Sequence, residues 1–141
     1  MVRILYRITK EQQMTDIARA LNELGIKEWV LRGEPTTKEE FASMYAKVTG
    51  ENANGTAIES SQESDWGVTW EDVSAKKDEL IAAEPMRLLR EERNIRIAKS
   101  DWMANSDVTM SDEWKTYRQA LRDITKSATS LDDVTWPTEP S

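Results

Sequence analysis

The sequence predicts an α+β protein, in which a small strand–helix–strand–helix unit is followed by a helical hairpin with an extended tail. Two observations carry this prediction. Within residues 1–50, stretches of alternating apolar and polar residues are interleaved with apolar residues spaced three and four apart. After residue 72 the helical spacing dominates, until a Ser/Thr-rich segment and two prolines end it. We therefore expect two domains, at residues 1–72 and 73–141.

The N-terminal unit is predicted from four consecutive segments. Alternation over Val2–Ile8 predicts a half-buried strand, and apolar spacing over Glu11–Leu24 predicts an amphipathic helix. Ile26–Leu31 reads as a second short strand. A second helix is expected over residues 37–50, beginning at a candidate capping box and ending at a glycine.

A polar stretch separates this unit from the rest of the chain. Residues 51–65 are small and polar, so we expect a loop, with Asn54-Gly55 as its turn. Trp66, Val68 and Trp70 then alternate with Gly67 and Thr69. This alternation fits either a third strand of the sheet or an aromatic patch on a loop.

The C-terminal half contains apolar residues that recur every seven positions and should therefore share one helix face. They are Ile81, Leu88, Ile95 and Trp102. Pro85 interrupts this stretch, and because proline breaks or kinks helices we expect a break near Glu84, with a new helix running to about Lys99. Every third residue of that helix is an arginine, which we interpret as a solvated, salt-paired face rather than a phosphate-binding stripe. These are Arg87, Arg90, Arg93 and Arg96.

The last helix is predicted to begin at Ser111, a candidate N-cap. Its apolar face is formed by residues at helical spacing, namely Trp114, Tyr117, Leu121 and Ile124. Residues 125–141 should be extended, since Pro137 and Pro140 preclude a continuing helix.

Composition narrows the range of functions. The 141 residues carry a formal net charge of −7 and include neither cysteine nor histidine. An acidic chain is repelled by phosphate backbones and anionic membrane surfaces, so we expect neither nucleic acid nor membrane as a partner. We also expect no signal peptide and no membrane-spanning run. The commonest bases, nucleophiles and metal ligands are missing, so we expect no enzyme, no metal and no cofactor.

Six tryptophans against one phenylalanine is an unusual ratio, and tryptophan is enriched at the centres of protein interfaces. The candidate partner-binding residues are therefore aromatic: Trp66, Trp70, Trp102, Trp114, Tyr117 and Trp136. We expect Trp102 and Trp114 to be core residues that meet near the hairpin connection. For Trp136, core packing and partner contact are equally compatible with the sequence.

Four motifs follow one another in the C-terminal part of the chain. They are Ser100-Asp101-Trp102, Glu113-Trp114, the run from Tyr117 to Ile124 (YRQALRDI), and Val134-Thr135-Trp136-Pro137. In this order, over about residues 87–140, the chain resembles the phage tail assembly chaperone family. The resemblance implies a non-catalytic helper or component of tail morphogenesis, with no catalytic residues to transfer.

The resemblance also implies partners and places of action. The partners would be phage tail, tail-fibre or baseplate proteins, met in the host cytoplasm during assembly or in the virion tail, with one or several copies per tail. Two alternatives from other classes stay open at this point. One is an inhibitor of a host protein. The other is a small hydrolase using paired carboxylates, for which the candidates are Asp65, Asp72, Asp101, Asp132 and Asp133.

Overall fold

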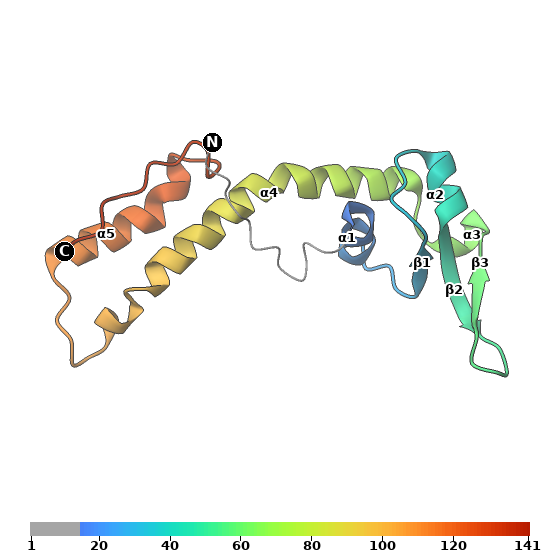
Figure 1. Ribbon diagram of the computed structural model, residues 1–141, viewed down its shortest axis with the longest axis horizontal. Coiled ribbons are helices and arrows are strands. Elements are labelled where there is room, and N and C mark those ends of the chain that lie inside the picture. Colours follow the sequence, from blue (N-terminus) through green and yellow to red (C-terminus); the bar gives the residue numbers. More distant parts are fainter. Residues whose placement is uncertain (1–14) are drawn as a thin grey trace. The chain divides into compact units, whose positions relative to one another are not determined.

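The computed structural model describes residues 15–141, so the predicted strand Val2–Ile8 and the start of the first helix lie outside the described residues. The described part contains a three-stranded antiparallel sheet and five α-helices (Figure 1), and the α+β prediction is confirmed. The chain forms two compact units, with a boundary between Ile81 and Ala82. We call them the N-terminal unit and the C-terminal unit.

The sheet of the N-terminal unit has the order β1-β2-β3. Its strands are β1 (Trp29–Leu31), β2 (Tyr45–Glu51) and β3 (Ala57–Ser60). In the antiparallel register, Val30 lies opposite Ala46, and Val48 opposite Glu59. Asn54 and Gly55 lie in the turn of the β2–β3 hairpin, where Gly55 has a φ of 80° that favours glycine.

Three helices accompany this sheet: α1 (Asp16–Glu23), α2 (Lys38–Met44) and the single turn α3 (Glu63–Trp66). Thr37 caps α2, because its hydroxyl accepts a hydrogen bond from the Glu40 backbone N–H at 3.2 Å. The Glu40 carboxylate reaches back to the Thr36 backbone N–H at 2.7 Å, and this bond lowers the pKa of Glu40. The predicted helix start is therefore confirmed, with the reciprocal bond displaced by one residue.

Three local predictions for this unit are wrong. The second helix ends at Met44 instead of running to Gly50, because the residues from Tyr45 onward pair with strands on both sides. The expected loop at 51–65 contains β3. Trp66 and Trp70 lie neither in a strand nor in a loop, since Trp66 ends α3 and Trp70 begins the next helix.

The core of the N-terminal unit is built around aromatic rings. Phe41 stacks on Tyr45, with ring centroids 4.8 Å apart, and the Trp66 ring meets both edge-on. The Trp66 indole N–H is buried, and it donates to the Ser60 carbonyl at 3.2 Å. Aliphatic residues of α1 and of the following long helix complete the cluster: Ile17, Ala20, Leu21 and Val73.

The long helix α4 (Trp70–Ala98) runs without a break through Pro85, so the predicted break near Glu84 is wrong. Proline lacks an N–H, which leaves the carbonyl four residues earlier, that of Ile81, without its usual helical partner. Both residues are exposed, so water can bond that carbonyl. Ion pairs of Arg87 with Glu84 at 2.6 Å and with Glu91 at 3.1 Å support the helix just after the proline.

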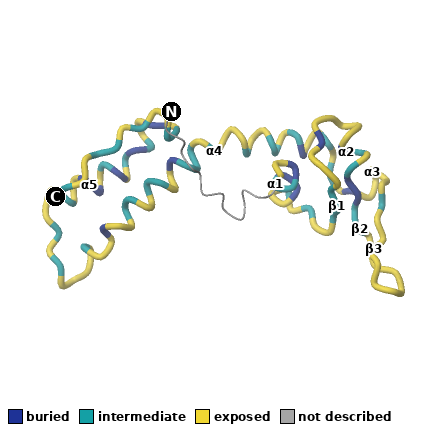
Figure 2. Tube along the Cα trace, viewed as in Figure 1, coloured by how far each residue is buried: buried dark blue, intermediate teal, exposed yellow. Residues whose placement is uncertain are grey.

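The C-terminal unit contains the rest of α4, the 3₁₀ turn η2 (Asp101–Ala104), helix α5 (Asp112–Asp123) and a second turn η3 (Ile124–Lys126). Ser111 caps α5 as predicted, accepting from the Trp114 backbone N–H at 3.4 Å. In Figure 2, buried positions recur among exposed ones along α5, as an amphipathic helix requires. The buried apolar residues of the whole C-terminal unit are Leu89, Tyr117, Leu121, Ile124 and Ala128.

Candidate functional site

A buried arginine joins two of the sequence motifs in the C-terminal unit. Arg118 of α5 is 6% exposed, and its guanidinium donates to the Ser100 hydroxyl at 2.6 Å and to the Ile97 carbonyl at 3.0 Å. It also forms an ion pair with Asp101 at 2.9 Å. Ile97 lies in the last turn of α4, where carbonyls lack helical partners. The Ile97 carbonyl also accepts from the backbone N–H and the hydroxyl of Ser100, and Arg118 adds a charged donor from another helix to this end of α4. We call these four residues the Arg118 network.

A second set of contacts attaches the tail to the same unit. The guanidinium of Arg96 lies 4.2 Å from the centre of the Trp136 ring, and it is held there by an ion pair with Glu92 at 2.9 Å. Earlier in the tail, the Asp133 carboxylate accepts hydrogen bonds from the backbone N–H groups of Thr129 and Ser130. These bonds lower the pKa of Asp133, with the Ser130 backbone N–H as the largest cause.

The structure separates the four C-terminal aromatic candidates. Trp114 and Tyr117 meet edge-on, with ring centroids 5.6 Å apart and Tyr117 buried. Trp102 was expected in the core but is 57% exposed, because η2 follows the end of α4 and leaves its ring outside the cluster. Trp136 lies beside Arg96 instead of across the other rings. The predicted meeting of Trp102 with Trp114 is therefore wrong.

An exposed apolar surface lies at the end of α4. Ile95 is 50% exposed and Trp102 is 57% exposed, so two of the three solvent-facing members of the seven-residue series lie here; the third, Ile81, is 50% exposed in the N-terminal unit. A shallow groove runs beside Ile95 and is lined, among the described residues, by one helix face: Arg87, Arg90, Glu91, Asn94, Ile95 and Ala98. Arg87 and Arg96 are ion-paired, whereas Arg90 has no ion pair in the described part of the chain. The surface therefore combines apolar side chains with an unpaired positive charge.

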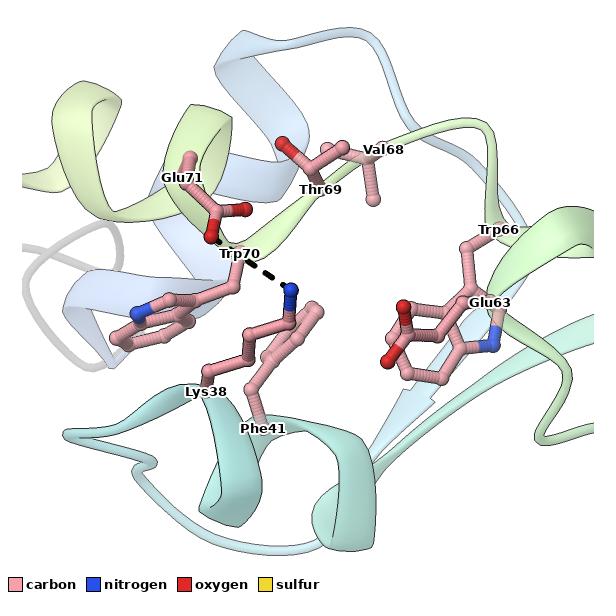
Figure 3. A pocket seen from close by; sticks show the side chains of 8 residues that line it. All are labelled: Lys38, Phe41, Glu63, Trp66, Val68, Thr69, Trp70 and Glu71. Carbon is pink, nitrogen blue, oxygen red and sulfur yellow. Dashed lines mark ion pairs between the residues drawn. The ribbon is translucent and has the colours of Figure 1, made fainter.

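The two N-terminal candidates lie at a small pocket (Figure 3). Its volume is about 120 Å³, and its lining combines three aromatic side chains with charged ones. Trp66 is 3% exposed and is a core residue that also lines the pocket, whereas Trp70 is half-buried. The full lining is Lys38, Phe41, Glu63, Trp66, Val68, Thr69, Trp70 and Glu71.

The described residues give little support to acid–base or metal chemistry. Among them, no group of three or more acidic, histidine or cysteine side chains is placed to hold a metal ion. The carboxyl groups whose pKa is shifted are Glu40, Asp123 and Asp133, and each shift is downward, mainly through hydrogen bonds to the carboxylate. A general acid requires the opposite shift.

Sequence reasoning missed the Arg118 network. Arg118 lies at spacings of four and three from Trp114 and Leu121, on the apolar face of α5. The position of a charged residue on the apolar face of a helix could therefore have predicted a buried, paired arginine. The order of the four motifs, and not Arg118, led to the C-terminal unit as the candidate functional region.

The part of the chain that contains the Arg118 network and the attached tail matches a known family. Residues 86–141 match the family model described as phage tail assembly chaperone protein, so the resemblance inferred over about residues 87–140 is confirmed. No significant match was found among curated proteins or among solved structures. None of the helices in the described range is long and apolar enough to cross a membrane.

Proposed function

We propose that this chain acts in bacteriophage tail assembly through non-covalent contacts with a tail protein, and that its C-terminal unit carries the main contact surface. The match of residues 86–141 to the phage tail assembly chaperone family is the observation that carries this proposal. The geometry supports it, because the Arg118 network and the Arg96–Trp136 contact use motif residues to hold the unit together. The exposed side chains of Ile95 and Trp102 are then left for a partner.

The surface indicates what the partner presents. Burying a half-exposed isoleucine and a tryptophan removes apolar area from water, and tryptophan is a frequent centre of binding energy. The unpaired guanidinium of Arg90 favours a carboxylate beside that apolar contact. We therefore propose an acidic, partly apolar segment of a tail, tail-fibre or baseplate subunit, which the chain covers before assembly in the host cytoplasm.

Mass spectrometry of purified mature phage particles tests which role the chain has. Peptides of the chain in infected-cell lysate, bound to a tail or fibre subunit and missing from particles, would support a chaperone that leaves. A fixed copy number in particles would instead make it a minor virion component in the tail. Failure to recover any tail, fibre or baseplate subunit with the chain from lysate would contradict the proposal.

Substitution of Trp102 tests the surface itself. In co-purification from infected cells, Trp102→Ala should weaken the complex about thirtyfold and reduce recovery of the tail subunit, since a hot-spot tryptophan contributes about 2 kcal/mol. Ile81→Ala is the matched control, because Ile81 is similarly exposed at 50% but lies in the N-terminal unit, outside both the Trp102 surface and the pocket in Figure 3. Equal recovery with both variants would remove Trp102 from the proposed surface.

The two alternative functions gain no comparable support. The family match does not favour a carboxylate hydrolase, and the shifted carboxyl pKa values in the described residues lie in the direction opposite to that of a general acid. For an inhibitor of a host protein, no particular contact or charge pattern in residues 15–141 supports the assignment.

A further inference from the structure

We propose that the pocket of the N-terminal unit binds a lysine or arginine side chain presented by an extended segment of a protein partner. The pocket lies within residues 38–71, outside the segment that matches the chaperone family, so this inference does not rest on that match. It would give the chain a second contact site, of different chemistry from the Trp102 surface.

The size and walls of the pocket fit one side chain. A volume of about 120 Å³ exceeds that of a water site by roughly tenfold and approaches the size of engineered cavities that bind benzene. The rings of Phe41, Trp66 and Trp70 supply its apolar walls, with Phe41 centred 5.5 Å from each tryptophan. Aromatic faces attract both the methylene groups and the cationic head of a basic side chain.

The charges around the pocket select a cation. Glu63 and Glu71 lie on opposite sides of it in Figure 3. The Glu63 carboxylate has no hydrogen-bond or ion-pair partner in the described residues. Glu71 is paired with Lys38, but only at 3.7 Å and with both side chains more than half exposed. Such a pair is weak, so an incoming ammonium or guanidinium group can displace Lys38.

Lys38 shows in the free protein how the site is used. Its side chain extends beside Phe41 toward Glu71, so the chain's own ammonium group already lies at the pocket (Figure 3). A basic side chain from a partner would make the same kind of contact and would add the unpaired Glu63. Lys38 is therefore a competitor for the site, and its removal should strengthen binding.

A neighbouring strand edge indicates that a protein segment presents the side chain. β3 is an edge strand of the described sheet, and its last residue, Ser60, accepts the Trp66 indole hydrogen bond that fixes one wall of the pocket. An extended segment that pairs with such an edge presents side chains at regular intervals along it. A partner segment that pairs along β3 would therefore bring one of its side chains to the pocket at the Ser60 end of the strand.

Titration with capped tripeptides tests the proposal on the full chain. The probes are acetyl-Gly-Lys-Gly-amide and its arginine and norleucine counterparts, and the readout is the NMR signals of the tryptophan indole N–H groups. The basic peptides should shift the Trp66 and Trp70 signals saturably, at concentrations on the order of millimolar. Equal shifts with norleucine would overturn the proposal, and so would comparable shifts of all six indoles.

Two substitutions should change this affinity in opposite directions. Glu63→Gln should weaken lysine binding about fivefold, whereas Lys38→Met should strengthen it about twofold, as expected for exposed charge pairs. Glu51→Gln, which removes the same charge at the end of β2, is the control and should leave the affinity unchanged. If Glu63→Gln and Glu51→Gln behave alike, or if Lys38→Met weakens binding, the pocket does not act in this way.

Discussion

The guanidinium of Arg118 lies 2.6 Å from the hydroxyl of Ser100, although eighteen positions separate the two residues in the chain. This bond connects the middle of α5 to the second residue after the end of α4. It also connects the Ser100-Asp101-Trp102 motif to the run from Tyr117 to Ile124. The sequence alone did not show that these two motifs lie close together.

Replacing Arg118 should destabilise the C-terminal unit. In Arg118→Met, the buried Ser100 hydroxyl loses its charged donor, Asp101 loses its ion pair, and the Ile97 carbonyl keeps only its bonds from Ser100, which should lower the free energy of unfolding by about 2–3 kcal/mol. Urea denaturation followed by circular dichroism measures the change. Arg122→Met is the control on the exposed side of α5 and should change the free energy by less than about 0.5 kcal/mol. A similar loss in both variants would mean that the network contributes nothing specific.

Tyr45 offers a stabilising substitution in the N-terminal unit. Its hydroxyl is buried and has no hydrogen-bond partner among residues 15–141, and burial raises the pKa of the phenol. Tyr45→Phe keeps the ring stacked on Phe41 and removes the unsatisfied group, so stability should rise by about 1 kcal/mol. Tyr45→Leu, which removes the stacking, should instead lower it by about 2 kcal/mol. Thermal unfolding distinguishes the two, and a loss in Tyr45→Phe would show that the hydroxyl is satisfied in solution.

Asp133 should make the stability of the C-terminal tail depend on pH. Because hydrogen bonds lower its folded-state pKa below the unfolded value of about 3.9, its contribution is present above that value and is lost as pH falls through the folded pKa. Asp133→Asn should therefore lower the melting temperature at pH 7 and reduce the further decrease on acidification below about pH 4. Asp132→Asn is the neighbouring control, because among the described residues the Thr129 and Ser130 hydrogen bonds go to the Asp133 carboxylate and remain in that variant. An unchanged acid profile in Asp133→Asn would contradict this role.

The attachment of the tail should depend on Trp136. Trp136→Ala removes the ring beside Arg96, and with it a contact of about 0.5–1 kcal/mol, so the tail should detach more often. Faster tryptic cleavage after Lys126 under native conditions would report this. Trp102→Ala is the control, because Trp102 is exposed and its loss should leave the cleavage rate unchanged. Identical rates in both variants would indicate that the tail is held elsewhere.

Pro85 should weaken α4. Pro85→Ala restores a backbone donor for the Ile81 carbonyl and should raise the free energy of unfolding by about 1–3 kcal/mol. Ala83→Gly, two residues earlier, should lower it by about 1 kcal/mol and shows how much helix propensity matters at this place. A destabilised Pro85→Ala variant would mean that the proline is needed where it stands.

Local patterns predicted the elements that are formed by local interactions. The capped starts of α2 and α5 and the Asn54-Gly55 turn follow from hydrogen bonds within a few residues, and each was found. The end of α2 was not, because Tyr45 and Val48 fit the apolar face of a helix as well as they fit a strand. Pairing of β2 with β1 and β3 decides between the two, and propensity does not report such pairing.

The candidate site residues also divide into those set by local sequence and those set by contacts between distant segments. Residue type suggested that Trp102 is a core residue, but its exposure depends on how the chain leaves α4, which no short segment encodes. Arg118 was not singled out, because arginine is rarely buried unless paired, and its partners come from a distant helix end. The ordered motifs nevertheless located the unit, since both ends of the Arg118 network belong to them.

The energetic cost of Pro85 depends on where in a helix it stands, and residues 86–141 begin directly after it. Within α4 it leaves a carbonyl unbonded, but at the first turn of a helix the same residue has no such cost, because its missing N–H would have no partner there. The family match begins at residue 86, next to this proline. The residue that interrupts the backbone hydrogen bonds of α4 therefore stands immediately before the segment that matches the family.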